Sequence, residues 1–310
     1  MAQQINLGKY AAEIKKALQI NASDEIIEKD LLLTLILAEF EKRKLGKELV
    51  FKGGTLLSRN YLKYHRFSED LDFVHKDSGK LRGLKRKARE REIKQFIDCF
   101  VQELKKLAGS LNMEFSTERN DTKFCTVLHG RAVYTFRLYY SRTRFIKIEI
   151  NFVEKLVHAP KEVSIKAITD FFDSRELMFT LGLRIENFKV SSYSIEEIIL
   201  EKYRAVLTRD ELKERDLFDL FLIKNSLKAE PRQIVEKIRN SSLIKREVGK
   251  IISEKLSLLQ RNEFFRSDEK MSDFAIIKYD RKDFDNFKEA IKPKLIDVCQ
   301  KFLANEGILK

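Results

Sequence analysis

The hydrophobic and polar positions in the first half of the chain follow two periods, which together predict α+β structure. Some segments repeat apolar residues at helical spacing, and others alternate apolar with polar residues or form short apolar runs. Ser23 or Asp24 is placed to cap the first helix, and Thr55 to cap the second. The pattern predicts helices over residues 23–45, 55–65 and 82–110, and strands over residues 48–51, 67–75, 112–118, 123–129, 132–141 and 144–154, with a tight turn at 129–131.

The pattern changes after Pro160, where helical periodicity takes over apart from one strand signal at residues 183–190. We therefore expect two domains: an α+β domain over residues 1–165 and a mainly helical domain over residues 166–310, with a ligand cleft between them. The predicted helices of the second half cover residues 194–208, 212–226, 231–241, 244–263 and 282–305, with a kink at Pro293 in the last.

Composition narrows the class of protein. With 43% hydrophobic and 35% charged residues, the 310-residue chain is typical of globular proteins. A formal net charge of +13 favours a polyanionic partner such as RNA, although a basic protein without such a partner has the same composition. The apolar run at residues 31–38 is too short to span a membrane, and residues 1–10 lack the apolar core of a signal peptide. The three cysteines, which form no C-x-x-C pair, fit reduced thiols, so we expect a cytoplasmic protein with no membrane partner.

Two aspartates interrupt the apolar strand pattern in "VFKGGTLLSRNYLKYHRFSEDLDFV", residues 50–74. Successive side chains of a strand point to opposite faces, so Asp70 and Asp72 share one face, about 7 Å apart. Unpaired buried carboxylates are costly, and we expect a positive charge to meet them. Mg²⁺ suits such a pair, because it takes one or two carboxylates and completes its shell with water and phosphate oxygens; Mn²⁺ is the alternative cation. An edge strand with solvated acids would give the same pattern.

The glycines before this strand suggest what the cation would accompany. Gly53 and Gly54 allow the backbone to approach a ligand closely, and a helix that begins near Thr55 would direct N–H groups at a phosphate. Glu149, in the alternating strand pattern "KIEI", is the best candidate for a third carboxylate of a two-metal site. Glu149 has a simpler interpretation as the ion-pair partner of Lys147. The combination predicts a nucleoside-triphosphate site.

These residues resemble a known family. Gly53-Gly54-Thr55 followed by Ser68-Glu69-Asp70-Leu71-Asp72-Phe73 resembles the polymerase-β-like nucleotidyltransferase superfamily, and more narrowly the AbiEii-type toxins of toxin–antitoxin and abortive-infection systems. The 15 residues between Gly54 and Asp70 exceed the usual spacing of the superfamily, but fit the AbiEii branch. The resemblance implies a mixed sheet with helices followed by a helical carboxy-terminal domain, and it places Ser68 close to the nucleotide.

A second stretch supports the narrower resemblance. "EEIILEKYRAVLTRDELKERDLFDL", residues 196–220, resembles the family's downstream motif. The resemblance implies that Lys202 contacts the nucleotide phosphates and that Asp216 is an essential acid, with Arg215 and Asp219 beside it. Asp216 and Asp219 are three residues apart and share a helical face. The alternative is a pair of packed helices held together by ion pairs among Glu201, Lys202, Arg209, Arg215 and Asp216.

We therefore expect a metal-dependent nucleotidyltransferase that transfers a nucleoside monophosphate from an NTP and releases pyrophosphate. The basic stretch at residues 85–92 favours an RNA acceptor, and the resemblance implies the 3′ end of tRNA and a role as a toxin, with a cognate antitoxin as a further partner. The alternatives are transfer to a protein hydroxyl and a non-catalytic, basic nucleic-acid-binding protein. Near the motif, Arg66 would contact a phosphate or pair with Glu69, and Lys52 would be solvated or near the triphosphate.

Overall fold

The structure is a computed structural model that describes residues 7–18, 22–128, 132–171, 188–225, 229–241, 245–267, 271 and 275–307. The chain forms two compact units, Met1–Val153 with Pro160–Ser192, and Glu154–Ala159 with Tyr193–Lys310. The predicted turn at 129–131 and most of the strand predicted at 183–190 lie outside the described residues. Within the described part of the chain, no helix combines the length and the apolar character that a bilayer span requires.

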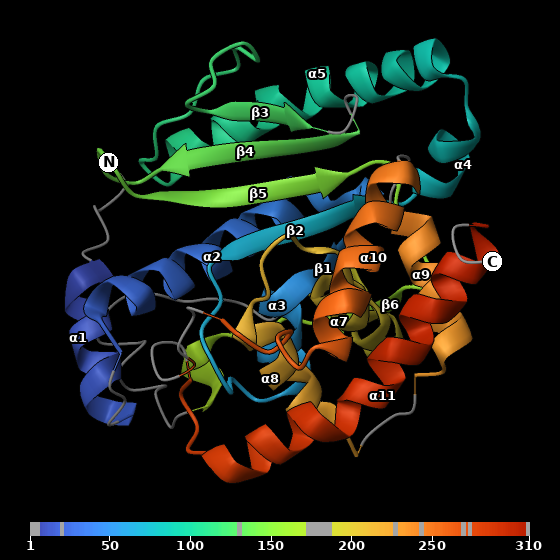
Figure 1. The fold of residues 1–310 in the computed structure, drawn as a ribbon. Helices are drawn as coiled ribbons and strands as arrows, with labels where there is room; N and C mark the ends of the chain where they lie inside the picture. Colours follow the sequence, from blue (N-terminus) through green and yellow to red (C-terminus); the bar gives the residue numbers. More distant parts are fainter. Residues whose placement is uncertain are drawn as a thin grey trace. The chain divides into compact units, whose positions relative to one another are not determined.

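The first unit is built around a mixed seven-stranded sheet in the order β3-β4-β5-β2-β1-β7-β6 (Figure 1). Parallel pairing joins β2 to β5 and β1 to β7, and all other neighbours are antiparallel. The strands are β1 (Leu49–Lys52), β2 (Asp70–His75), β3 (Cys125–Leu128), β4 (Val133–Tyr139), β5 (Phe145–Asn151), β6 (Lys161–Ser164) and β7 (Lys189–Ser192).

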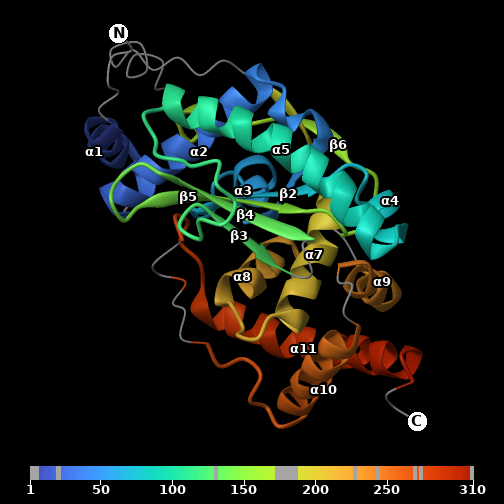
Figure 2. The same ribbon diagram turned by 90° about the horizontal axis from the view of Figure 1, so that it is seen from above.

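One face of this sheet is apolar and covered by α2 (Asp24–Lys42) and α5 (Arg86–Ser110), which Figure 2 shows together on the same side. Ser23 caps α2 as predicted, by accepting a hydrogen bond from the Ile26 N–H. Aromatic rings join the layers: Phe40 of α2 stacks on Phe73 of β2 with centroids 5.5 Å apart, and meets Phe100 of α5 edge-on at 6.0 Å. Burial of this face leaves the opposite face free to carry polar groups.

Several elements of the first unit differ from the sequence-based expectation. The helix predicted at 82–110 is two helices, α4 (Ser78–Gly83) and α5, because the chain turns at Leu84 and Lys85. The strand predicted at 112–118 is wrong: only an isolated bridge from Glu114 to Tyr139 forms there. The expectation that the chain is helical beyond Pro160 apart from one strand at 183–190 is also wrong, because β6 forms soon after Pro160 and pairs with β7, which begins within that predicted strand. Helix α1 (Leu7–Leu18) and the 3₁₀ turns η1 (Leu45–Glu48) and η3 (Ile168–Phe171) were not predicted.

The glycine turn leads directly into a helical segment. Helix α3 (Gly53–Leu56) begins at Gly53 itself and continues as the wider π-helical turn η2 (Leu57–Tyr61), so Thr55 lies inside the helix and is not its cap. Arg59 anchors this segment: its buried guanidinium donates to the Asp30 carboxylate at 2.9 Å and to the Thr34 hydroxyl at 2.7 Å. The segment between the glycines and β2 is therefore attached to α2.

The second unit is helical, as predicted. Phe218 and Phe284 meet edge-on with ring centroids 5.5 Å apart in its core, and Pro293 lies inside the last helix. The predicted kink at Pro293 and the predicted domain boundary at residue 165 stay predictions. The helices are α7 (Ile195–Thr208), α8 (Glu214–Ile223), α9 (Pro231–Ser241), α10 (Lys245–Gln260) and α11 (Arg281–Asn305).

A buried lysine joins the short segment 154–159 to the helices of this second unit. Lys237 of α9 is fully buried, and its ammonium contacts the carboxylates of Glu154 at 2.5 Å and Glu197 at 2.7 Å. Glu197 also accepts hydrogen bonds from the backbone N–H groups of Val157 and His158. Hydrogen bonds and opposite charges offset the cost of burying these groups, so the network fixes where the chain crosses into the second unit.

Candidate active site

Three acidic side chains lie together on the polar face of the sheet. Asp70 and Asp72 share this face of β2, and the parallel register places Asp72 beside Glu149 of β5 and Asp70 beside Lys147. Neighbouring strands are about 4.8 Å apart, so the carboxylates lie within reach of a common ligand. All four side chains are half-buried, while the residues between them in sequence point into the apolar core. The expected pairing of two strand aspartates with a third acid is thus present in the register of β2 and β5.

Two lysines partly neutralise these acids. The Lys147 ammonium lies 2.9 Å from Asp70 Oδ2, and Lys52 of β1 lies opposite Asp72 in the antiparallel register. Lys52 is buried and therefore not solvated. The pKa of Asp72 is raised to about 6, first by burial and then by the negative charges of Glu149 and Asp70, which outweigh the lowering effects of Lys147 and Lys52. Burial lowers the pKa of Lys147, but the surrounding carboxylates outweigh it and the net shift is upward. Negative charge thus remains in excess on this face.

The glycine turn lies directly against Asp72. Gly53 has φ +87°, in the left-handed region, and a Cβ at this position would lie 2.4 Å from Asp72 Oδ2. The buried Thr55 hydroxyl donates a hydrogen bond of 2.5 Å to the Asp70 carbonyl and lies 3.0 Å from Ser68 Oγ. The structure therefore brings Gly53, Thr55 and Ser68 together with the two aspartates of β2.

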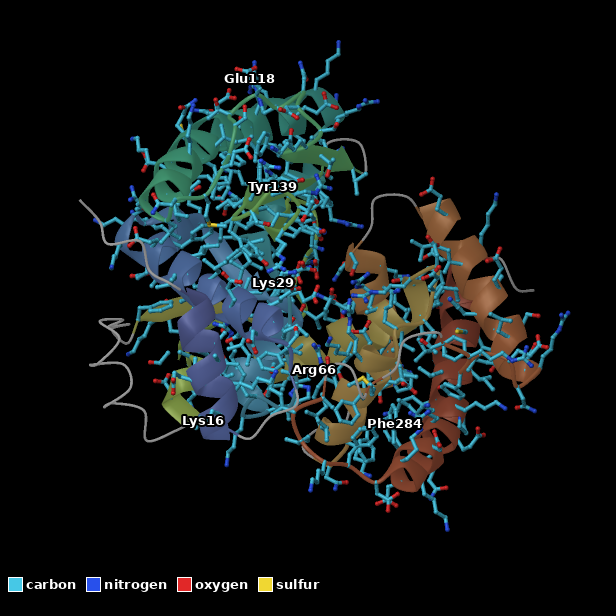
Figure 3. The ribbon with its side chains drawn as sticks, turned by 90° about the vertical axis from the view of Figure 1, so that its left-hand side faces the viewer. Lys16, Lys29, Arg66, Glu118, Tyr139 and Phe284 are labelled. Carbon is cyan, nitrogen blue, oxygen red and sulfur yellow. The ribbon has the colours of Figure 1, made fainter. Side chains whose placement is uncertain are left out.

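Arg66 packs beside the second glycine. A Cβ on Gly54 would lie 2.6 Å from the Arg66 Nη2 atom. The Arg66 side chain, labelled in Figure 3, is buried and donates from Nη1 to the Phe67 carbonyl at 2.8 Å. Glu69, the other partner considered for Arg66, forms an ion pair with Lys29 of α2 at 3.2 Å. A guanidinium is thus held next to the glycine turn by local contacts.

We expect Gly53→Ala to remove most activity at a modest cost in stability. The left-handed backbone strains any residue with a Cβ, at a cost of about 1–2 kcal/mol, and the new methyl group would displace the Asp72 carboxylate. Gly83→Ala is the matched control, because a Cβ there meets nothing within 4 Å. Thermal unfolding and nucleotide transfer should be measured for both variants. Full activity in Gly53→Ala would show that the close approach to Asp72 is unimportant.

The three carboxylates are ligands of the type that divalent cations prefer, but in this structure they do not converge on a common position. Among the described residues, no group of three or more His, Cys, Asp and Glu side chains is positioned to hold a metal ion. The ion pair of Lys147 with Asp70 is one reason, because it directs that carboxylate to the ammonium. The donor set consists of hard carboxylate oxygens, which Mg²⁺ and Mn²⁺ prefer. Burial and then the neighbouring carboxylates raise the pKa of Asp72, and the positive charge of a bound cation would oppose both effects.

The pKa of Asp72 predicts how the stability of the metal-free protein depends on pH. A carboxyl group whose pKa is raised on folding stabilises the folded state below its unfolded pKa of about 4, and this contribution is lost as pH rises through about 6. The melting temperature of the wild type should therefore fall relative to that of Asp72→Asn between pH 5 and pH 7. Adding Mg²⁺ at pH 7 should raise the melting temperature of the wild type more than that of the variant. Parallel pH profiles would contradict the assignment.

In the second unit, the predicted residues form a buried ion-pair cluster. Lys202 of α7 lies 2.8 Å from the Asp216 carboxylate and 2.6 Å from that of Asp219, both on α8. Arg209 reaches the second oxygen of Asp216 at 2.9 Å. Burial raises the pKa of Asp216, but Lys202 and Arg209 more than offset this, and the net pKa is lowered. Arg215 lies half-buried in the first turn of α8. The cluster resembles the ion-pair alternative considered for this motif, with Asp219 as an additional member.

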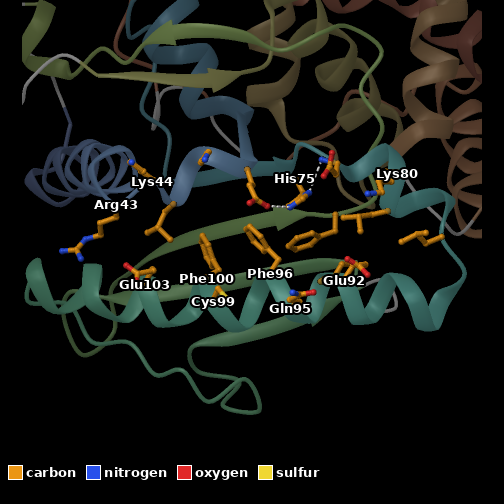
Figure 4. Close-up of a pocket in the computed structure, with 18 residues that line it drawn as sticks. Arg43, Lys44, His75, Lys80, Glu92, Gln95, Phe96, Cys99, Phe100 and Glu103 are labelled. Carbon is orange, nitrogen blue, oxygen red and sulfur yellow. Dashed lines mark hydrogen bonds and ion pairs between the residues drawn. The ribbon is translucent and has the colours of Figure 1, made fainter.

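A cavity of about 580 Å³ lies elsewhere in the first unit, beside α5 (Figure 4). Its lining includes the rings of Phe96, Phe100 and His75, and His75 is hydrogen-bonded at Nδ1 by the Asp77 N–H and contacts Glu48 through Nε2. Burial lowers the pKa of His75 more than the neighbouring carboxylates raise it. None of the predicted site residues lines this cavity, so it is separate from the acidic face of the sheet.

Comparison with known proteins gives the class of this fold and site. The family model described as "Nucleotidyl transferase AbiEii toxin, Type IV TA system" matches residues 35–305, and the chain therefore belongs to this family. The fold is similar to that of MenT4, a nucleotidyltransferase toxin from Mycobacterium tuberculosis H37Rv, with a TM-score of 0.52 and 13% identity over 94% of this chain and 92% of MenT4. JHP933 from Helicobacter pylori aligns with a TM-score of 0.39 and 14% identity over 93% of this chain and 97% of that protein. No curated protein matches the sequence.

The predicted family and fold class are confirmed by these comparisons. The chain is a nucleotidyltransferase toxin of a type IV toxin–antitoxin system, which implies an NTP substrate, a cognate antitoxin and a divalent metal. The roles of the individual site residues stay predictions. Lys147 was expected on the same face as Glu149 and as its ion-pair partner; the two side chains do share a face of β5, but the carboxylate that Lys147 pairs with is that of Asp70.

Proposed function

We propose that this toxin transfers a nucleoside monophosphate from an NTP to the 3′ end of tRNA. The observation that carries the proposal is the register of β2 and β5, which puts Asp70, Asp72 and Glu149 on one face beside Gly53. An α-phosphate held there would be attacked by the acceptor hydroxyl. The new bond forms between the acceptor oxygen and the α-phosphorus, the bond to the β-phosphate oxygen breaks, and pyrophosphate leaves.

The glycine turn positions the triphosphate in this proposal. The absence of side chains at Gly53 and Gly54 lets Asp72 and Arg66 pack directly against the turn, and the phosphate oxygens would bind at the N–H groups at the start of α3 beside these two side chains. Thr55 ties this turn to β2 through its hydrogen bond to the Asp70 carbonyl. That bond fixes the distance between the phosphate-binding backbone and the acidic face. Lys52, buried at the end of β1, adds a positive charge beside the triphosphate.

Asp70, Asp72 and Glu149 would hold the divalent metal, with Mg²⁺ as the preferred ion and Mn²⁺ as the alternative. When bound, the metal supplies charge neutralisation for the phosphates and activates the acceptor hydroxyl. Lys147 neutralises Asp70 in the metal-free protein. Its ammonium would have to leave this carboxylate for metal coordination, and it would then be available to a phosphate oxygen of the nucleotide.

Lys202 and Asp216 act in the second unit. Family resemblance assigns Lys202 to the nucleotide phosphates and Asp216 to an essential acidic role, with Arg215 and Asp219 beside them. The buried contacts of Lys202 with both aspartates support a positioning role for Asp216 and Asp219, because they hold the ammonium in a defined place. Arg209, paired with the outer oxygen of Asp216, reinforces this arrangement.

The net charge of +13 supports an RNA acceptor, because phosphate neutralisation and counterion release favour its binding. The test is to incubate the purified protein with each labelled NTP, Mg²⁺ or Mn²⁺, and total tRNA. Label at the tRNA 3′ end is the expected result. Label on protein would favour transfer to a protein hydroxyl, and RNA binding without any label under all metal conditions would favour a non-catalytic protein. Either of these results would overturn the proposal.

A further inference from the structure

Positive charge is concentrated in one short stretch of the first unit. Residues 80–94 contain eight lysines and arginines and only two acidic residues, in a chain whose net charge is +13. These residues form α4, the turn after it and the first turns of α5, which Figure 2 shows next to one another. We call this surface the basic corner and define it by its members Lys80, Arg82, Lys85, Arg86, Lys87, Arg89 and Lys94.

Four lysines of this surface have no counter-ion among the described residues. Lys80, Lys85, Lys87 and Lys94 are exposed, and their ammonium groups form no ion pair or side-chain hydrogen bond with any described residue. Elsewhere in the stretch, Arg86 pairs with Glu90 and Arg91 with the adjacent Glu92. Most surface lysines gain little from pairing, but several unpaired cations so close together repel one another and attract a polyanion.

The start of α5 adds to this positive potential. The helix begins at Arg86, its N-cap residue Lys85 provides no side-chain cap, and its first turn contains no acidic residue. The amino-terminal end of a helix carries a partial positive charge and free N–H groups, so acidic residues are favoured there and basic ones are not. The sequence nevertheless places cations at this end of a 25-residue helix. A bound anion would reduce the repulsion between these cations and the positive end of the helix.

Two arginines of the basic corner are held in place by backbone carbonyls. Arg82 donates from Nη1 to the Val153 carbonyl at 3.1 Å, and Arg89 from Nη1 to the Leu84 carbonyl at 3.3 Å. Burial lowers the pKa of Arg82, and the charge of Arg89 lowers it further, as expected for two guanidinium groups close to each other.

The basic corner adjoins the strand that carries Glu149. Arg82 contacts Val153, four residues beyond Glu149 in the direction of β5. A strand rises about 3.3 Å per residue, and the chain bends after β5 ends at Asn151, so this contact lies at most about 13 Å along the chain from Glu149. The corner also lacks an exposed apolar side chain, since the exposed large hydrophobic residues of the described chain are Val127, Leu128 and Ile277. A surface without apolar anchors suits nucleic acid better than a lipid bilayer.

We propose that the basic corner binds the phosphate backbone of the RNA acceptor and so directs its end to the acidic face of the sheet. This inference rests on the proposed function, since it names the surface that the acceptor of that reaction would use. The basic side chains act as point charges along the backbone, which binds RNA with little dependence on its sequence.

The test measures RNA binding without nucleotide or turnover. The affinity of 5′-labelled total tRNA is measured by fluorescence anisotropy at several salt concentrations for the full-length wild type and for the triple variant Lys85→Gln, Arg86→Gln, Lys87→Gln. Loss of three phosphate contacts should lower the slope of log K against log salt by about 2 to 3, and weaken binding at 0.15 M salt by roughly tenfold or more. Circular dichroism checks that the exposed substitutions leave the fold intact.

A second triple variant tests whether RNA binding depends on the basic corner or on the overall charge of the protein. Lys105→Gln, Lys106→Gln and Lys123→Gln remove the same charge from exposed positions in the last turns of α5 and just before β3, where Lys106 pairs with Glu103 and Lys123 with Glu114, and should leave the salt slope close to that of the wild type. Equal losses in both variants, or a wild-type slope in the first, would overturn the proposal. An Asp70→Asn, Asp72→Asn protein should bind tRNA like the wild type while transferring no nucleotide. Failure of the surface and failure of the proposed reaction are thereby distinguished.

Discussion

Replacing Asp72 by asparagine is expected to abolish nucleotide transfer while leaving the fold intact. The substitution keeps the size of the side chain and removes the charge beside Glu149. If Asp72 is a metal ligand, its loss removes several kcal/mol of transition-state stabilisation, which corresponds to roughly a thousandfold in rate at about 1.4 kcal/mol per tenfold. The rate should be measured with labelled NTP, and the fold by circular dichroism.

The matched control for this variant is Asp77→Asn. Asp77 is an exposed aspartate two residues beyond β2, and its side chain does not cap α4. The control substitution removes the same charge from the same part of the chain and should leave the rate of nucleotide transfer unchanged. Substantial transfer by Asp72→Asn would exclude a direct role of this carboxylate, and equal losses in both variants would indicate a general electrostatic effect.

Lys202→Met is expected to lower the free energy of unfolding by about 3–5 kcal/mol, because it leaves two aspartates buried without their main counter-ion. Urea unfolding measures this loss. Lys224→Met removes a similar side chain from an exposed position just after α8 and should cost little. Combining Lys202→Met with Asp219→Asn should recover part of the stability, since the second change removes one of the two negative charges that Lys202 neutralises.

The same variants separate a structural role from a role in nucleotide binding. If Lys202 contacts the phosphates as well as the aspartates, the combined variant will regain stability but bind NTP no better than Lys202→Met alone. If the lysine only holds the two helices together, NTP affinity will return along with stability. Unchanged stability in Lys202→Met would contradict the ion pairs seen between α7 and α8.

The parts of the site that were predicted from sequence are those set by local geometry. Alternation along β2 and β5 placed Asp70, Asp72 and Glu149 on the polar face, because side-chain direction in a strand depends only on position. The capping of α2 by Ser23 was also predictable, because it depends only on a serine directly before the first helical residues. The helical character of the second unit followed from periodicity, which is strong in long amphipathic segments.

The remaining features depend on contacts between segments far apart in the sequence. β6 is short and mostly exposed, with no apolar alternation, and it forms only because β7 pairs with it. The ion pair of Lys147 with Asp70 depends on the register between two strands whose paired residues are 77 positions apart in the sequence. The contact of Lys237 with Glu154 joins side chains 83 positions apart. Sequence patterns contain no direct signal for such pairings.

The second unit contains two separate stretches of the chain, residues 154–159 and residues 193–310, with part of the first unit between them. Neither unit is therefore a continuous piece of polypeptide. A truncated protein that ends at residue 165 would lack β7 and expose the free hydrogen-bonding edge of β1, a typical starting point for aggregation. A fragment that starts at residue 193 would lose Glu154 and leave the fully buried Lys237 with fewer counter-charges. Dissection of this toxin into halves should consequently yield poorly soluble products, and reconstitution from two co-expressed pieces would need a cut elsewhere, in an exposed loop within one unit.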